Sequence, residues 1–151
     1  MTALELWAWG ANNYGQLGVG AECEQVETPV RVPLPSELRG QKFEVSGGGG
    51  HSALTDGDGS VWMCGWNNKG QLGVGGKANC NAFTKVASLP EAVTAVSCGW
   101  DFTFVLGRSG RVYGSGSNAF GQLGLPASTA HIETFTLIPG VERIVSVSCG
   151  M

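Results

Sequence analysis

Residues 65–73 read Gly-Trp-Asn-Asn-Lys-Gly-Gln-Leu-Gly. The pattern Gly-x-Asn-x-x-Gly-Gln-Leu-Gly occurs twice more, at residues 10–18 and 116–124. A string that occurs three times in one chain is better explained by one packing role than by three ligand-binding loops. We therefore predict that the motif belongs to the scaffold. The motif positions are Gly10, Asn12, Gly15, Gln16, Leu17, Gly18, Gly65, Asn67, Gly70, Gln71, Leu72, Gly73, Gly116, Asn118, Gly121, Gln122, Leu123 and Gly124.

Each type of residue in the motif has its own expected role. Glycines supply turns that need a positive φ or a close approach of two backbones. The glutamines can hydrogen-bond backbone groups that the turn leaves without partners, and the leucines can fill the space between neighbouring units.

The spacing around the motif indicates one unit copied along the chain. Val45 lies 20 residues before Gly65, and Val96 lies 20 residues before Gly116. From the last motif glycine to the next such valine there are 27 residues in the first connector and 23 in the other two, so only the connectors vary in length. We expect a single array with units at about 1–44, 45–95 and 96–146, and the start of a further unit at 147–151.

Within a unit, short strand-like runs alternate with turns. The runs 45–46, 52–55 and 61–65 flank glycine-rich turns, and the runs 102–106 and 112–116 repeat the last two at an offset of 51 residues. No helical period is present. A repeat of this length with short β-branched and aromatic strands is typical of a propeller blade, so the sequence predicts an all-β fold: a partial β-propeller of about three blades, each a four-stranded antiparallel sheet.

Composition and charge exclude several functional classes. The chain has 151 residues, 42% hydrophobic and 14% charged, which is typical of a globular protein. Nine basic and twelve acidic residues give a net charge of −3 with the basic residues scattered, so we expect no nucleic-acid partner. The apolar start at residues 1–9 contains Glu5 and is too short for a signal or membrane helix, so we expect an intracellular protein without membrane insertion.

Neither the cysteines nor the histidines form a recognisable chemical site. The five cysteines contain no C-x-x-C pair, and Cys98 and Cys149 occupy the same repeat position, which indicates small, buried, reduced residues. His51 and His131 have no partner at metal-ligand spacing. We expect no cofactor, no metal and no catalytic residue, and we assign His51 a structural role in its loop.

Two further stretches complete the repeat pattern. Residues 45–54, Val-Ser-Gly-Gly-Gly-Gly-His-Ser-Ala-Leu, and residues 96–103, Val-Ser-Cys-Gly-Trp-Asp-Phe-Thr, stand before the second and third motifs. Together with the three motifs they resemble the regulator of chromosome condensation repeat family, over nearly the whole chain. Within that family the resemblance is strongest to exchange factors linked to secretion.

The resemblance implies a seven-bladed ring, a location in the cytoplasm and possible presence in the nucleus, and nucleotide exchange on a small GTPase or binding of secretory-tethering proteins. Exchange of this kind is not covalent catalysis. An interaction scaffold without exchange activity is the alternative. Because the chain ends inside the front half of a repeat, a truncated product without independent activity, able to self-associate through open blade faces, is a third reading.

The chain departs from the family pattern at two places. Phe102 stands where the third unit should have the histidine that corresponds to His51. We expect the hydrogen bond of His51 to reach a neighbouring backbone, and packing to replace it at Phe102. No insertion between residues 65 and 150 is large enough for the wedge that the family uses to displace nucleotide, and the proline-bearing connector within residues 19–44 is expected to be a surface loop.

Two neighbouring residues are candidates for contact with a partner. The resemblance suggests an acidic contact residue at Asp101, whereas the alternative is a solvated turn carboxylate. Beside it, Trp100 is the other candidate, and its alternative is a packed aromatic residue.

Overall fold

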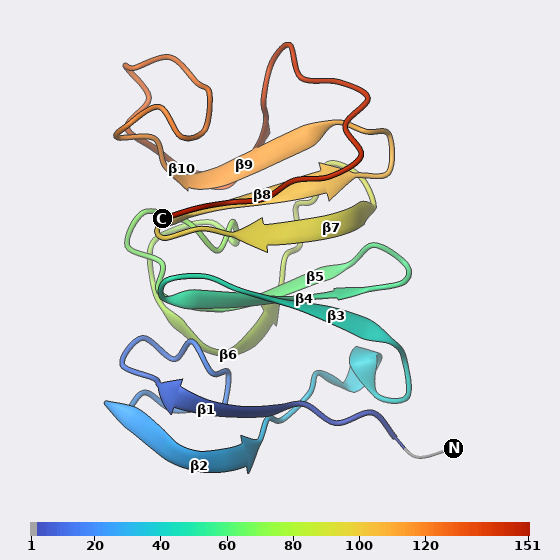
Figure 1. Ribbon diagram of the computed structural model, residues 1–151, viewed down its shortest axis with the longest axis vertical. Helices are drawn as coiled ribbons and strands as arrows, with labels where there is room; N and C mark the ends of the chain where they lie inside the picture. Colours follow the sequence, from blue (N-terminus) through green and yellow to red (C-terminus); the bar gives the residue numbers. More distant parts are fainter. Residues whose placement is uncertain (1–2) are drawn as a thin grey trace.

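The computed structural model describes residues 3–151 as an all-β protein. Within those residues, the single helical element is one 3₁₀ turn, Ser36–Leu38. Within the described part of the chain, no helix has the length and apolar character needed to cross a membrane. Three antiparallel sheets follow one another along the long axis of the molecule (Figure 1).

The first sheet has only two strands, β1 (Trp7–Ala11) and β2 (Gln25–Arg31). The second has four, β3 (Phe43–Gly47), β4 (His51–Asp56), β5 (Val61–Gly65) and β6 (Cys80–Lys85), in that spatial order. The third has β7 (Val93–Cys98), β8 (Phe102–Gly107), β9 (Val112–Ser117) and β10 (His131–Leu137), also in chain order.

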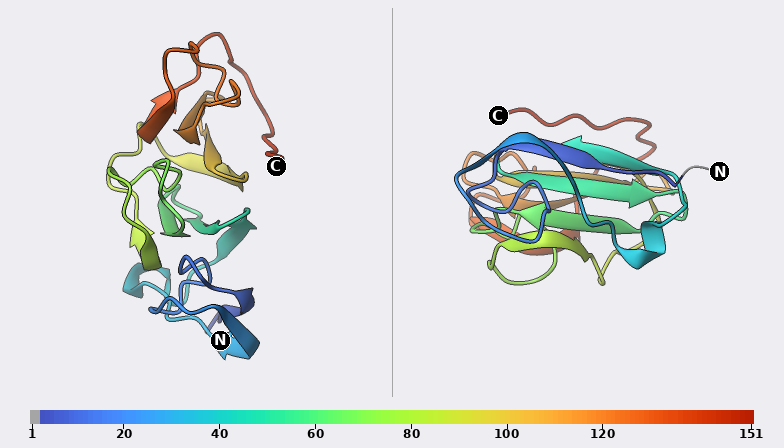
Figure 2. Two further views of the ribbon diagram at one scale, coloured as in Figure 1. Left: turned by 90° about the vertical axis from the view of Figure 1, so that its left-hand side faces the viewer. Right: turned by 90° about the horizontal axis from the view of Figure 1, so that it is seen from below.

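The expected strands are present, and the partial propeller is confirmed for the second and third sheets. The first sheet differs, because the described residues contain no counterparts of the two strands that precede the motif strand in the other sheets. Turned by 90°, the sheets fan out from one side of the molecule rather than stacking in two layers (Figure 2).

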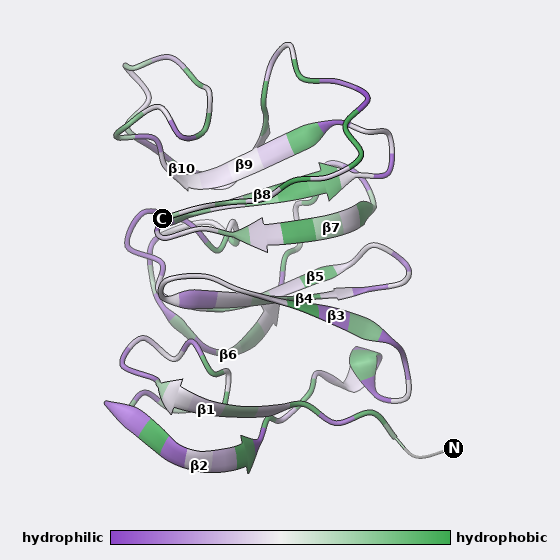
Figure 3. Cartoon of the chain, in the orientation of Figure 1, coloured by the Kyte–Doolittle hydropathy of each residue, from purple (hydrophilic) through white to green (hydrophobic). Residues whose placement is uncertain are grey.

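The hydrophobic cores lie between successive sheets, so each sheet buries the apolar side chains of its neighbour. Leu38, Leu54 and Trp62 pack between the first and second sheets. Between the second and third sheets, Met63 and the motif residue Leu72 are fully buried in a larger cluster. Burying one such side chain contributes about 1.5–3 kcal/mol. Of the strands of the third sheet, β8 is hydrophobic along most of its length, whereas β2 mixes hydrophilic and hydrophobic residues (Figure 3).

The first connector corrects our expectation of a simple surface loop. It contains β2, and its four extra residues lie between β2 and β3, where eleven residues stand in place of the seven between β6 and β7. Two of these eleven residues, Val32 and Leu38, are buried. The insertion is therefore partly core, because the 3₁₀ turn places Leu38 against Leu54 and Trp62.

Candidate functional site

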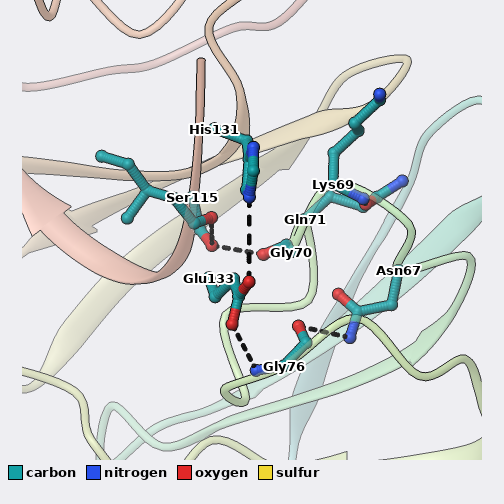
Figure 4. Close-up of polar contacts among 9 residues, drawn as sticks. Asn67, Lys69, Gly70, Gln71, Gly76, Ser115, His131 and Glu133 are labelled. Carbon is teal, nitrogen blue, oxygen red and sulfur yellow. Dashed lines mark hydrogen bonds and ion pairs between the residues drawn. The ribbon is translucent and has the colours of Figure 1, made fainter. Parts of the chain in front are cut away.

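Each motif loop is closed by its asparagine. The Nδ2 group of Asn67 donates to the carbonyl of Gly76 at 3.2 Å (Figure 4) and to that of Ala78 at 2.9 Å, and its Oδ1 accepts from the Leu72 N–H at 3.1 Å. Asn12 and Asn118 accept from their own motif leucines in the same way, at 3.2 and 3.1 Å. All three asparagines are buried, so one side chain satisfies several backbone groups that would otherwise be buried without partners.

The motif glutamines hydrogen-bond the turn backbone, as expected. In each loop, the glutamine Oε1 accepts from the N–H of the residue two positions before it, which is Tyr14, Lys69 or Phe120, at 2.8–2.9 Å. The glycines at the corners of the loop have positive φ, 81° at Gly70 and 65° at Gly73. These contacts are internal to the loop and give the motif a scaffold role.

The second motif loop docks on the third sheet. The hydroxyl of Ser115 on β9 donates to the Gly70 carbonyl, and Glu133 on β10 accepts from the Gly75 N–H with its carbonyl at 3.0 Å and from the Gly76 N–H with its carboxylate at 3.1 Å (Figure 4). The ring of Phe135 lies so close to Gly73 that a Cβ there would collide with it. The first loop likewise reaches the second sheet through the Gln16 carbonyl, which accepts from Ser52, so each of the first two loops joins its own sheet to the next.

His51 takes part in a buried relay between sheets, which corrects the expectation that it bonds to backbone. Its Nε2 lies 2.7 Å from the Thr103 hydroxyl, which in turn donates to the Gln71 carbonyl at 2.7 Å. The Thr103 hydroxyl donates its only proton to the Gln71 carbonyl, so it must accept the hydrogen bond from His51. His51 therefore carries its proton on Nε2. The third unit has Phe102 in the histidine position, and it buries an aromatic ring there instead.

The other ring nitrogen of His51, Nδ1, is buried without a hydrogen-bond partner. Burial lowers the pKa of His51 from 6.5 to about 4, an effect only partly offset by the backbone of Phe102. The imidazole is therefore neutral at physiological pH. His51 acts as a structural donor, and a proton-carrying role does not fit this environment.

A second set of contacts between sheets involves the cysteine position. Cys98 N–H donates to the Ser46 hydroxyl at 3.2 Å, and Cys149 N–H donates to the Ser97 hydroxyl at 2.9 Å. Burial raises the pKa of Cys98 to about 12 and raises that of the half-buried Cys149. All five cysteines are free thiols. Cys149 is less covered than expected, since no sheet follows it in residues 3–151.

The two candidate contact residues lie together in the turn between β7 and β8. Trp100 is 48% exposed, and its ring packs on Gly49, where a side chain would displace it. The Asp101 carbonyl accepts from the Ser117 N–H at 2.9 Å, and its carboxylate approaches Gln122 Nε2 at 3.5 Å. Both residues stand at the end of the sheets that carries the motif loops, which we call the motif-loop end.

The hydroxyl groups that join the sheets were not predicted from the sequence. Ser52 donates to the Gln16 carbonyl at 2.8 Å as Thr103 does to Gln71. The sequence does contain a signal for these hydroxyl groups, because Ser52 and Thr103 are 51 residues apart in the same repeat position. The outermost strands β2, β6 and β10 were not located either, since their polar, half-exposed sequences lack strong apolar alternation.

The sequence comparisons bear on this architecture. Models of the regulator of chromosome condensation (RCC1) repeat match residues 5–55, 58–106 and 109–151. The chain is 41% identical to the secretion-regulating guanine nucleotide exchange factor of Bos taurus, over 99% of this chain and 32% of the relative, and 41% identical to that of Mus musculus over the same shares. It therefore spans about a third of the length of these relatives.

Solved structures show the same fold. Prp20p from Saccharomyces cerevisiae, in a structure described together with its binding to Gsp1p and histones, superposes with a TM-score of 0.87 at 24% identity, over 97% of this chain and 37% of that one. Human WBSCR16 superposes with a TM-score of 0.79 at 24% identity, over 95% and 37%. With the motif loops, the fanned sheets and the three matched segments, these findings show that the chain belongs to the regulator of chromosome condensation repeat family.

Proposed function

We propose that this chain is a protein-binding part of a propeller that acts on a small GTPase as a guanine nucleotide exchange factor, in a pathway linked to secretion. The exchange-factor relatives found by sequence support the class of partner. Exchange requires no covalent catalyst, only a surface that stabilises the nucleotide-free GTPase. The chain spans a third of those relatives, so the activity proposed for it is that of a contributing surface.

The observation that carries the proposal is the exposed aromatic pair at the motif-loop end. Trp100 is 48% exposed and Phe120 is 95% exposed, and both stand in short turns fixed by the scaffold. Large aromatic side chains held rigidly on a surface are typical anchors of protein interfaces. Tyr14 and Trp66, stacked with ring centroids 4.9 Å apart, add a further aromatic pair in the loops of the neighbouring sheets.

The Asp101 carboxylate beside Trp100 has a neutral donor, Gln122 Nε2 at 3.5 Å, but no cationic partner within residues 3–151. Among residues 3–151 the ion pairs are Arg31 with Glu5 and His131 with Glu133, so no cation neutralises Asp101. An unneutralised carboxylate next to an exposed indole fits a partner surface that carries a basic residue beside an apolar pocket. The same chemistry would serve the alternative, a scaffold that binds a GTPase or a secretory-tethering protein without releasing its nucleotide.

Release of a fluorescent GDP analogue from a panel of small GTPases tests the proposal. We expect the chain to bind at least one GTPase, and Trp100→Ala to weaken that binding about 30-fold, the effect of losing about 2 kcal/mol at an aromatic anchor. Trp7→Ala is the matched control, since Trp7 is 49% exposed on β1 of the first sheet. Both variants should keep the wild-type melting temperature.

The outcomes separate the candidates. Faster nucleotide release that depends on Trp100 supports an exchange surface. Binding that depends on Trp100 but leaves release unchanged supports the scaffold. If Trp7→Ala weakens GTPase binding as much as Trp100→Ala does, or if the folded chain binds no GTPase, the motif-loop end is not the partner surface.

A further inference from the structure

The hairpin turn between β8 and β9 is closed by a side chain from outside the hairpin. The turn, residues 107–111, lies at the end of the third sheet away from the motif loops (Figure 1). The carboxylate of Glu91, in the connector between β6 and β7, accepts from the Ser109 N–H at 2.8 Å and from the Ser109 hydroxyl at 2.6 Å. It also accepts from the Tyr113 hydroxyl at 2.7 Å. We call these three hydrogen bonds the Glu91 clasp.

The corresponding turn of the second sheet supplies its own carboxylate. There, Asp56 accepts from the N–H groups of Asp58 at 3.0 Å and Ser60 at 2.8 Å. Gly107 stands at the repeat position of Asp56, 51 residues later, and a Cβ on it would collide with the carboxyl group of Glu91. The third sheet therefore replaces a contact within the turn by a contact between the turn and the connector that leads into β7.

The clasp holds a charged carboxylate against an exposed serine. The hydrogen bond from the Ser109 hydroxyl lowers the pKa of Glu91, so this carboxyl group is ionised at neutral pH. An ionised carboxylate only accepts hydrogen bonds, so the contact depends on the proton of Ser109 Oγ. Ser109 is exposed, whereas Tyr113 is buried. Ser109 is therefore the part of the clasp that a second protein can reach.

Two arginines flank this serine in the turn. Arg108 and Arg111 are exposed, and among residues 3–151 neither forms an ion pair. Ser109 is the one serine or threonine of the whole sequence with a basic residue directly before it, and also the one with a basic residue two positions after it. Positive charge on both sides of an exposed hydroxyl group is complementary to an enzyme with an acidic substrate groove.

We propose that Ser109 is phosphorylated by an ATP-dependent protein kinase with an acidic substrate groove, and that the phosphoryl group opens the Glu91 clasp. Ser109 Oγ forms a bond to the γ-phosphorus of ATP, the bond from that phosphorus to the β,γ-bridging oxygen breaks, the hydroxyl proton passes to a base of the kinase, and ADP leaves. Phosphoserine no longer donates to Glu91 and carries about −1.5 to −2 charge beside it, so the two anions repel. The guanidinium groups of Arg108 and Arg111 stand ready to pair with the phosphate instead.

Opening the clasp loosens the connector without unfolding the sheets. Leu89 and Val93, on either side of Glu91, pack in the core between the second and third sheets, and the Val93 N–H donates to the Gly59 carbonyl at 3.0 Å. These contacts do not involve Ser109. The turn lies at the opposite end of the sheets from the motif loops, so this proposal is independent of the proposed GTPase surface.

The first test asks whether Ser109 in the folded 151-residue chain accepts a phosphoryl group. The probes are ATP and the catalytic domain of protein kinase C, and tandem mass spectrometry locates the phosphate. We expect phosphate on Ser109, and Arg111→Gln should slow its incorporation at least about fivefold, because one of the two flanking charges is lost. Ser109→Ala is the control for other sites. If Ser109 of the folded chain stays unmodified, the site is wrong, even where a peptide of residues 105–113 is phosphorylated.

The second test measures the clasp by amide hydrogen exchange at Ser109, whose N–H donates to Glu91. Each rate is divided by that of the same amide in the peptide of residues 105–113, with or without phosphate. We expect phosphorylation to speed this relative exchange at least about tenfold, and to leave Val93 within about twofold. Glu91→Gln is the matched variant, because its side chain keeps an oxygen acceptor without the charge, so phosphorylation should change its exchange less than about threefold. Unchanged exchange at Ser109 in the phosphorylated wild-type chain, or full acceleration in Glu91→Gln, would overturn the opening of the clasp.

Discussion

The buried relay from His51 to Thr103 predicts a specific loss of stability in mild acid. The pKa of His51 falls from 6.5 to about 4 in the folded chain because burial disfavours the charged imidazole. Below pH 6.5 the unfolded chain therefore binds a proton that the folded chain does not. The stability contributed by His51 is complete above pH 6.5 and is lost as the pH falls towards 4, below which no further loss arises from this group.

The magnitude follows from the difference in pKa. Each unit corresponds to about 1.4 kcal/mol, so the free energy of unfolding should fall by about 3 kcal/mol from this group between pH 7 and pH 4. His51→Phe removes the titration and places the side chain that the third unit already has at Phe102. At neutral pH the variant loses one hydrogen bond and adds ring volume, which together cost about 1–3 kcal/mol.

Urea unfolding of both proteins at half-unit steps from pH 7.5 to pH 4.5 checks this expectation. All other titrating groups are shared, so the difference between the two curves isolates His51. We expect the stability advantage of the wild-type chain to shrink by about 2.5 kcal/mol between pH 7.5 and pH 4.5. Parallel curves, with a difference constant to about 0.5 kcal/mol, would refute the buried neutral imidazole.

Three further perturbations follow from the contacts between sheets. Thr103→Val should lower the free energy of unfolding by about 2–5 kcal/mol in urea titrations, because it leaves two buried polar groups unpaired, whereas Thr103→Ser should cost about 1 kcal/mol. Gly73→Ala should destabilise the chain by more than about 2 kcal/mol, since its Cβ meets the Phe135 ring at a φ of 65°; Gly75→Ala, with a φ of 83° but open space, should cost less in the same assay. A thiol reagent followed by mass spectrometry should modify the exposed Cys23 first, and rapid labelling of the buried cysteines in the folded chain would contradict the core assignments.

The fold could be predicted from the sequence, but not all of the contacts that stabilise it could. The strands that flank glycine turns could be located because the same apolar alternation recurs at an offset of 51 residues. The outer strands could not, because β6 and β10 are held by backbone pairing and by the preceding motif loop rather than by apolar periodicity. The two-stranded first sheet was also missed, because every unit was expected to be a four-stranded blade.

The candidate site was predictable only in part. The position of Trp100 and Asp101 in a repeat turn is visible in the sequence, but the exposure of Trp100 depends on Gly49, a residue of the preceding unit. The relay of His51 was assigned to backbone because its partner, Thr103, belongs to the next sheet. In both cases the contact that determines the environment of the residue joins two units, so the sequence of a single unit does not predict it.

These crossing contacts also indicate where the array is held most firmly. The junction between the second and third sheets has the His51 relay, the Ser115 hydroxyl and two bonds to Glu133, whereas the terminal segment is tied to the third sheet through Cys149 and Ile144. In a repeat array, stability is a sum of units and of the interfaces between neighbours, so opening should begin at the junction with the fewest bonds. Segment 144–150 should therefore exchange its amides faster than β7, its counterpart one sheet earlier.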